Sequence, residues 1–169
     1  DPRFALARSY LGGMQTRSLG DGLTVSALGL GCMGMSEFYG AHDDAQSLET
    51  LAAAPDRGID FFDTADMYGA GHNERLLGSF LAGRPERPIV ATKFGIMRAP
   101  DGRALGINGR PDYVRQACDA SLQRLGLDAG RHRLDPLRPA DLGTACADHR
   151  VVGHVLRLER RDVHTAARK

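Results

Sequence analysis

Three side chains suited to acid–base chemistry lie in or just after short apolar runs between residues 59 and 95. Asp63 ends the run "IDFFD", Tyr68 comes five residues later, and Lys93 lies within "PIVATKFG". Only Lys93 and Lys169 of the 22 basic residues are lysine, so Lys93 is an unusual choice of cation here. Taken alone, "FFDTADMYG" is equally typical of a buried strand that stops at a polar turn.

A carboxylate, a phenol and an ammonium group that lie together can assist a hydride donor in the reduction of a carbonyl. The ammonium stabilises the phenolate, and a carboxylate behind the lysine orients the lysine and keeps it charged. A tyrosine in that environment can give its proton to an oxygen on which negative charge develops. If a nicotinamide delivers hydride to the carbonyl carbon, Tyr68 would protonate the oxygen.

The pattern of elements predicts that one sheet edge brings these residues together. Strands that alternate with helices through short connections indicate βαβ units and a parallel sheet. Such sheets carry their functional loops at the carboxyl ends of the strands, where Asp63, Tyr68 and Lys93 would lie. The expected elements are a hairpin within 14–31, strands at 27–31, 59–63, 88–95 and 151–158, helices at 43–58, 73–83 and 110–126, and a long polar loop at 97–109.

Composition narrows the class of protein. The 169 residues are 42% hydrophobic, which suits one domain with a buried core. The net charge of +1 indicates no nucleic-acid partner. No apolar run approaches the roughly 20 residues that span a bilayer, so we expect no membrane partner. Three cysteines without C-x-x-C spacing favour a reducing cytoplasm. His149 and His154 lack matching ligand spacing, and no metal site is expected.

Four stretches carry a resemblance to a known family. "LGLGCMGMSEFYG", "FFDTADMYGAGHNERLLG", "VATKFG" and "SLQRLGLD" occur in this order, and together they resemble the aldo-keto reductases. The similarity is greatest to a microbial branch with G-C-M-G-M at the first strand, and it covers roughly residues 14–128. The resemblance implies a (β/α)8 barrel, NADPH as cofactor, and reduction of aldehydes or ketones as small-molecule carbonyl substrates.

The resemblance also implies roles for individual residues. Tyr68 would be the general acid, Lys93 its activating partner, and Asp63 the carboxylate behind the lysine and a neighbour of the cofactor. The backbone of Gly31, Cys32 and Met33 would lie beside the nicotinamide end of the cofactor.

A fourth strand should follow "RLGLD" in the family and end in a histidine that orients the substrate carbonyl. Here "RLGLDAGRHRLDP" places His132 before Arg-Leu-Asp-Pro, much as the family does. The apolar strand residues between Asp128 and His132 are missing, however. His132 is therefore either the family histidine after a deletion or a chance match in altered sequence.

The extent of the resemblance to the aldo-keto reductases suggests three segments. Residues 1–13 form an N-terminal tail, 14–128 an aldo-keto reductase-like half-barrel, and 129–169 a divergent tail, disordered or frame-altered. A complete barrel needs about 200 residues or more, so a truncated part-barrel with an N-terminal β-hairpin is expected. Exposed strand edges would favour self-association. The alternative to a reductase is thus a non-catalytic half-barrel, an interaction module or an inactive fragment.

Overall fold

The computed structural model describes residues 13–19, 23–84, 88–99 and 101–127, together with the backbone of two further strands. Helices and strands alternate through most of this length. In chain order the elements are β1 (Thr16–Ser18), β2 (Thr24–Ser26), β3 (Leu30–Gly31), the 3-10 helix η1 (Met33–Met35), α2 (Asp44–Asp56), β4 (Phe61–Asp63), the 3-10 helix η2 (Tyr68–Gly71), α3 (His72–Leu81), β5 (Ile89–Phe94), β6 (Ile96–Arg98), β7 (Ala104–Ile107), α4 (Pro111–Leu125), β8 (His132–Pro136) and β9 (Val152–Leu158).

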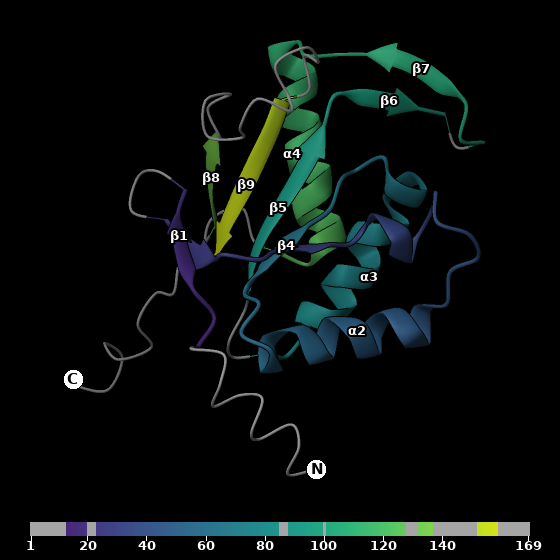
Figure 1. The fold of residues 1–169 in the computed structure, drawn as a ribbon. Coiled ribbons are helices and arrows are strands. Elements are labelled where there is room, and N and C mark those ends of the chain that lie inside the picture. The colour runs from purple at the N-terminus through teal and green to yellow at the C-terminus, as the bar shows by residue number, and fades with distance from the viewer. Residues whose placement is uncertain are drawn as a thin grey trace, which may run out of the picture.

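The main sheet has the strand order β3-β4-β5-β9-β8. Strands β3, β4 and β5 are parallel and are each followed by a helix, as consecutive units of a (β/α)8 barrel would be. Strand β9 instead runs antiparallel to β5, and β8 runs antiparallel to β9 (Figure 1). The sheet formed by these strands is open, with β3 at one edge and β8 at the other.

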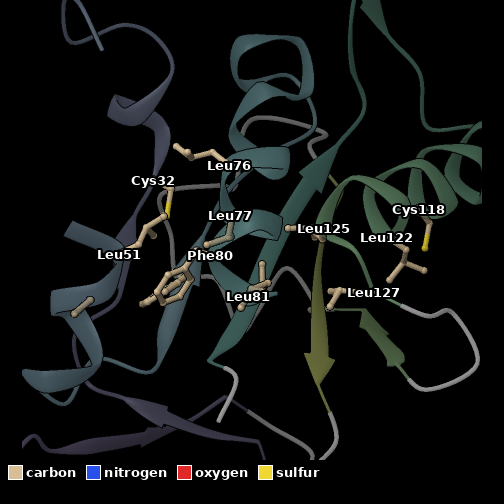
Figure 2. Packing of buried hydrophobic residues seen from close by; sticks show 13 residues of the cluster. Cys32, Leu51, Leu76, Leu77, Phe80, Leu81, Cys118, Leu122, Leu125 and Leu127 are labelled. Atoms are coloured by element: carbon tan, nitrogen blue, oxygen red, sulfur yellow. The ribbon is translucent and has the colours of Figure 1, made fainter. Parts of the chain in front are cut away.

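The larger core fills the space between the sheet and its helices. Phe62 of β4 and Val90 of β5 are completely buried, and they face leucines of α2, α3 and α4. Helix α3 contacts both α2 and α4. Figure 2 shows this cluster, whose buried members are Cys32, Leu51, Ala54, Phe62, Leu76, Leu77, Phe80, Leu81, Val90, Cys118, Leu122, Leu125 and Leu127. No helix of the described residues is long and apolar enough to cross a membrane.

A second, smaller cluster covers the opposite face of the sheet. Leu23 and Val25 of the hairpin segment pack with Ala91 of β5, and Phe61 and Ile89 lie against them. Because side chains alternate between the faces of a strand, Val90 points to the helices while Ala91 points to the hairpin. The predicted N-terminal hairpin is thus present, and it shields this face of the sheet.

The helix ends follow from specific residues. The Asp43 carboxylate accepts hydrogen bonds from the Ala45 and Gln46 amides, at 2.8 and 3.2 Å, and so caps α2. Pro111 occupies the first turn of α4, where its missing N–H costs nothing. Gly126 ends α4 in the left-handed conformation, with φ of 66°. The predicted start of α2 and both predicted ends of α4 are confirmed.

A buried ion pair joins α3, α4 and β5. Glu74 of α3 is fully buried, and one of its carboxylate oxygens accepts a hydrogen bond from Arg124 Nε at 2.6 Å. The other oxygen accepts one from the Thr92 hydroxyl at 2.5 Å. Gly78 lets the two helices approach, since a Cβ there would lie 2.6 Å from the Arg124 carbonyl oxygen. The carboxylate and the glycine together fix the α3–α4 packing.

Two segments differ from the sequence prediction. The stretch 97–109, predicted as a polar loop, contains most of the β6–β7 hairpin, which turns at Gly102 with φ of 82°. All four residues of β7 are exposed, so the hairpin lacks the apolar alternation that would have revealed it. Strand β9 agrees with the strand-like pattern at 151–158, whereas β8 lies in sequence that predicted no element. The rest of the divergent tail lies outside the described residues.

Replacing Arg124 with methionine should destabilise the domain by about 3–5 kcal/mol, because the substitution leaves the buried Glu74 carboxylate without its cation. Arg115 is exposed in the same helix, and Arg115→Met should change stability by no more than about 0.5 kcal/mol. Urea unfolding followed by circular dichroism measures both values. Equal losses in the two variants would show that the ion pair does not hold α3 to α4.

Candidate active site

Asp63 and Lys93 meet at the carboxyl edge of the parallel strands. Asp63 is the last residue of β4 and is in register with Ala91 of β5, two residues before Lys93. Lys93 Nζ lies 2.5 Å from Asp63 Oδ1 and also donates a hydrogen bond to the Thr64 carbonyl oxygen at 2.7 Å. The side chains are 28% and 43% exposed for Lys93 and Asp63, so this ion pair is open to solvent.

Tyr68 completes the group of three. The Lys93 ammonium lies 5.1 Å from the centroid of the Tyr68 ring, within the range of a cation–π contact. Just after Tyr68 the chain turns through three left-handed residues, Gly69, Ala70 and Gly71, with φ of 54°, 50° and 82°. For Ala70 this conformation costs on the order of 1 kcal/mol. This turn connects Tyr68 directly to α3.

Buried polar side chains support the carboxyl edge of the strands from the interior of the domain. The Thr64 hydroxyl donates to Asn73 Oδ1 at 2.7 Å. Asn73 Nδ2 in turn donates to the Cys32 carbonyl oxygen and to Ser36 Oγ, both at 2.7 Å. Asn73 therefore links the loop after β3 to the end of β4. The sequence analysis missed these residues, although a polar residue on the buried side of α3 was an available signal.

Gly31, Cys32 and Met33 lie at the same edge. Gly31 pairs with Asp63 in the sheet, and the Cys32 amide donates to the Asp63 carbonyl oxygen at 2.8 Å. Burial, with the Asp63 carboxylate as a second cause, raises the pKa of the Cys32 thiol to about 12. Cys32 is thus a protonated, buried thiol rather than a nucleophile.

His132 occupies a different position along the sheet. It is the first residue of β8 and pairs with Leu158 of β9, whereas Lys93 pairs with Gly153. These two partner positions on β9, Gly153 and Leu158, are five residues apart, which corresponds to about 17 Å of extended strand. Because β9 is antiparallel to β5, this backbone register puts His132 toward the amino end of β5, away from Asp63 and Lys93.

A cavity lies next to this site, between η2, the β6–β7 hairpin and α4. Its volume is about 670 Å³, and its lining includes Asp66, Arg98, Tyr113 and Arg124 but none of Asp63, Tyr68 and Lys93. Burial, followed by the Glu74 carboxylate, raises the pKa of Asp66 from 3.8 to about 6. Asp66 Oδ1 is buried and has no hydrogen-bond partner in the described part of the chain.

The sheet edge is open beside Gly31. A Cβ built on Gly31 would meet no atom within 4 Å, so the space beside this residue is open. The Asp63 and Lys93 side chains border the same edge and are accessible. Gly31, Asp63 and Lys93 thus lie together at the edge where the sequence analysis expected the nicotinamide end of the cofactor.

Comparison with known proteins identifies the protein family of this chain. The model of the aldo/keto reductase family matches residues 27–130 of the chain. The chain belongs to this family. A curated relative, an aldo-keto reductase named for NADP(+) from Schizosaccharomyces pombe, is 42% identical over 115 residues. That alignment covers 67% of this chain and 34% of the relative, so the chain spans about a third of the relative's length.

Solved structures of the family show the same fold. The holo form of an aldo-keto reductase from Bacillus halodurans matches with a TM-score of 0.57 and 36% identity, over 68% of this chain and 37% of that chain. The glycerol dehydrogenase of Gluconobacter oxydans matches with a TM-score of 0.55 and 30% identity, over 68% and 36%. The described β3–α4 region is therefore part of a (β/α)8 barrel, which confirms the expected fold class.

The Asp66→Asn substitution should stabilise the domain at pH 8 but not at pH 4. Because the folded state holds the Asp66 proton more tightly than the unfolded state, its contribution is complete below about pH 4 and is lost as pH rises through about 6. The variant cannot ionise and should melt about 2–4 °C higher than the wild type at pH 8. Thermal unfolding across this pH range tests the expectation, with exposed Asp119→Asn as control. A constant difference at all pH values would contradict it.

Proposed function

We propose that this chain carries the proton-donating half of an NADPH-dependent carbonyl reductase active site. The observation that carries the proposal is the contact of Lys93 with both Tyr68 and Asp63 at one strand edge. Membership of the aldo/keto reductase family and the NADP(+) named for the Schizosaccharomyces pombe relative add support. The substrate class is a small aldehyde or ketone, reduced to the alcohol.

Each residue has a distinct part in the proposed reaction. NADPH, when bound, would supply the hydride that adds to the carbonyl carbon. Tyr68 donates its phenolic proton to the carbonyl oxygen, so that the products are the alcohol and NADP⁺, and solvent then returns a proton to the tyrosine. Lys93 places a positive charge beside the phenol, and Asp63 holds the lysine in that position.

The cofactor would lie along the edge formed by Gly31, Cys32 and Met33. Asn73 fixes this loop through the Cys32 carbonyl oxygen, so the loop is supported independently of any ligand. The Cys32 thiol is turned inward and takes no part in the proton transfer. His132 is left out of the proposed machinery, because its backbone register lies toward the other end of the strands.

Replacing Tyr68 with phenylalanine removes only the hydroxyl group that donates the proton. Turnover should fall by about 10²–10⁴, the range typical of lost acid–base catalysis, with NADPH affinity little changed. NADPH oxidation at a saturating aldehyde concentration gives the rate, and the change in NADPH fluorescence on titration gives the affinity. Tyr39→Phe serves as control, since Tyr39 is exposed and lies outside the group of three. Equal rates in wild type and Tyr68→Phe would remove Tyr68 from the mechanism.

Lys93→Met should lower turnover by at least about 10², because it removes the charge beside Tyr68 and leaves Asp63 without its cation. Lys93→Arg keeps the positive charge but changes its shape and reach, so it should retain more activity than the methionine variant. The same NADPH assay compares the two variants. If both lose activity to the same extent, position and not charge is the essential property of Lys93.

An alternative function is a non-catalytic part-barrel that pairs with another chain through its sheet edges. The open edges at β3 and β8 support this alternative within the described strands. Measurements of NADPH binding and of oligomeric state distinguish the two functions. NADPH binding at micromolar concentration with aldehyde-dependent oxidation supports the reductase, whereas a stable dimer in light scattering without NADPH binding supports the pairing module.

A further inference from the structure

We propose that His42, Asp44 and His72 form a zinc-binding site on the surface where α2 and α3 begin. Each residue offers one ligand atom, and these three atoms all lie within 4.8 Å of one another. Two of the residues come from the start of α2 and the loop before it, and the third is the first residue of α3. The sequence analysis considered only His149 and His154 as metal ligands and expected no metal site, whereas Asp44 and His72 lie 28 residues apart in the chain.

One of the three ligand–ligand distances is already close to what zinc requires. His72 Nε2 lies 3.1 Å from Asp44 Oδ2, and the rings of His42 and His72 have centroids 5.2 Å apart. Ligand atoms of a tetrahedral zinc site are about 3.3 Å apart, given bond lengths of about 2.0–2.1 Å. Since His42 and Asp44 are exposed, small side-chain rotations bring all three ligand atoms to that spacing.

Buried residues fix the orientation of the His72 ring. Ser36 Oγ lies 2.8 Å from His72 Nδ1, and Asn73 Nδ2 donates to the same oxygen at 2.7 Å. Ser36 and Asn73 are only 7% and 1% exposed, so they hold this contact rigidly. A zinc ion needs the lone pair of His72 Nε2, which puts the proton on Nδ1, and Ser36 Oγ can accept it. Metal-ligating histidines commonly have such a partner on the second ring nitrogen.

The ligand set selects the type of cation. Two imidazole nitrogens and one carboxylate suit zinc, with water at the fourth position, whereas calcium and magnesium prefer oxygen ligands. The amino ends of α2 and α3 carry partial positive charge, which disfavours a loosely held cation at this place. A cation here must therefore be bound directly by the nitrogen atoms. Without metal, the same contact would be a surface His–Asp pair, which contributes little to stability.

Zinc would join the loop after β3 to the start of α3. The loop contributes His42 and is also held by Ser36, while α3 contributes His72 four residues after Tyr68. Bound metal therefore stabilises the folded state without entering the proposed proton transfer. At a zinc concentration 100-fold above the dissociation constant, the melting temperature should rise by about 5–10 °C.

Calorimetric titration of the chelator-treated chain with zinc chloride tests the proposal. We expect one zinc ion per chain, with an affinity at least 10-fold lower in His42→Gln and in Asp44→Asn. His42 is exposed, and its substitution removes a ligand without touching the buried core. Glu49→Gln is the matched control for Asp44→Asn, because Glu49 is also an exposed carboxylate of α2. This substitution should leave the affinity unchanged. Cobalt(II) should give the visible absorption of a four-coordinate site in the wild type only.

Two results would overturn the proposal. One is zinc binding of equal affinity in the wild type and His42→Gln. The other is an affinity that falls in a His149→Gln, His154→Gln double variant but not in His42→Gln, which would assign the metal to the C-terminal segment. Magnesium chloride, titrated in parallel, should produce no heat of binding.

Discussion

The buried carboxylate of Glu74 is the interaction on which the arrangement of this domain depends. A charge taken out of water is costly unless it is paired and hydrogen-bonded, and here Arg124 and Thr92 supply both partners. These contacts fix α3 against α4 and against β5 simultaneously. Thr92 precedes Lys93 in the strand, and alternation sends the lysine to the opposite face. A contact made among the helices thus determines where the ammonium of the candidate site lies.

The parts of the fold that the sequence predicted are those with strong local patterns. Apolar runs that end in polar residues predicted β4 and β5, and the order of strands and helices predicted their parallel pairing. The contact of Asp63 with Lys93 follows from that pairing, because both residues lie at strand ends. The start of α2 was delimited by its Asp43 cap, and α4 was delimited by Pro111 at its start and Gly126 at its end.

The remaining features depend on contacts between residues far apart in the chain. The Asn73 network and the His72–Asp44 contact join positions up to 41 residues apart, and no local pattern encodes such a pairing. The β6–β7 hairpin is exposed on β7, so it has no hydrophobic period to detect. The antiparallel direction of β9 could not be predicted from the sequence either, since a strand-like pattern carries no information about the partner or the direction of the strand.

The antiparallel pairing of β9 with β5 has a consequence for assembly from fragments. In a (β/α)8 barrel the next strand would run parallel to β5, with slanted, evenly spaced hydrogen bonds. Here five residues of β5 are already paired with β9, from Val90 to Phe94. A complementary barrel fragment supplied in trans would therefore have to compete with β9 for these backbone groups. Addition of a strand at this position is a displacement reaction, whose rate is limited by the opening of the resident ladder.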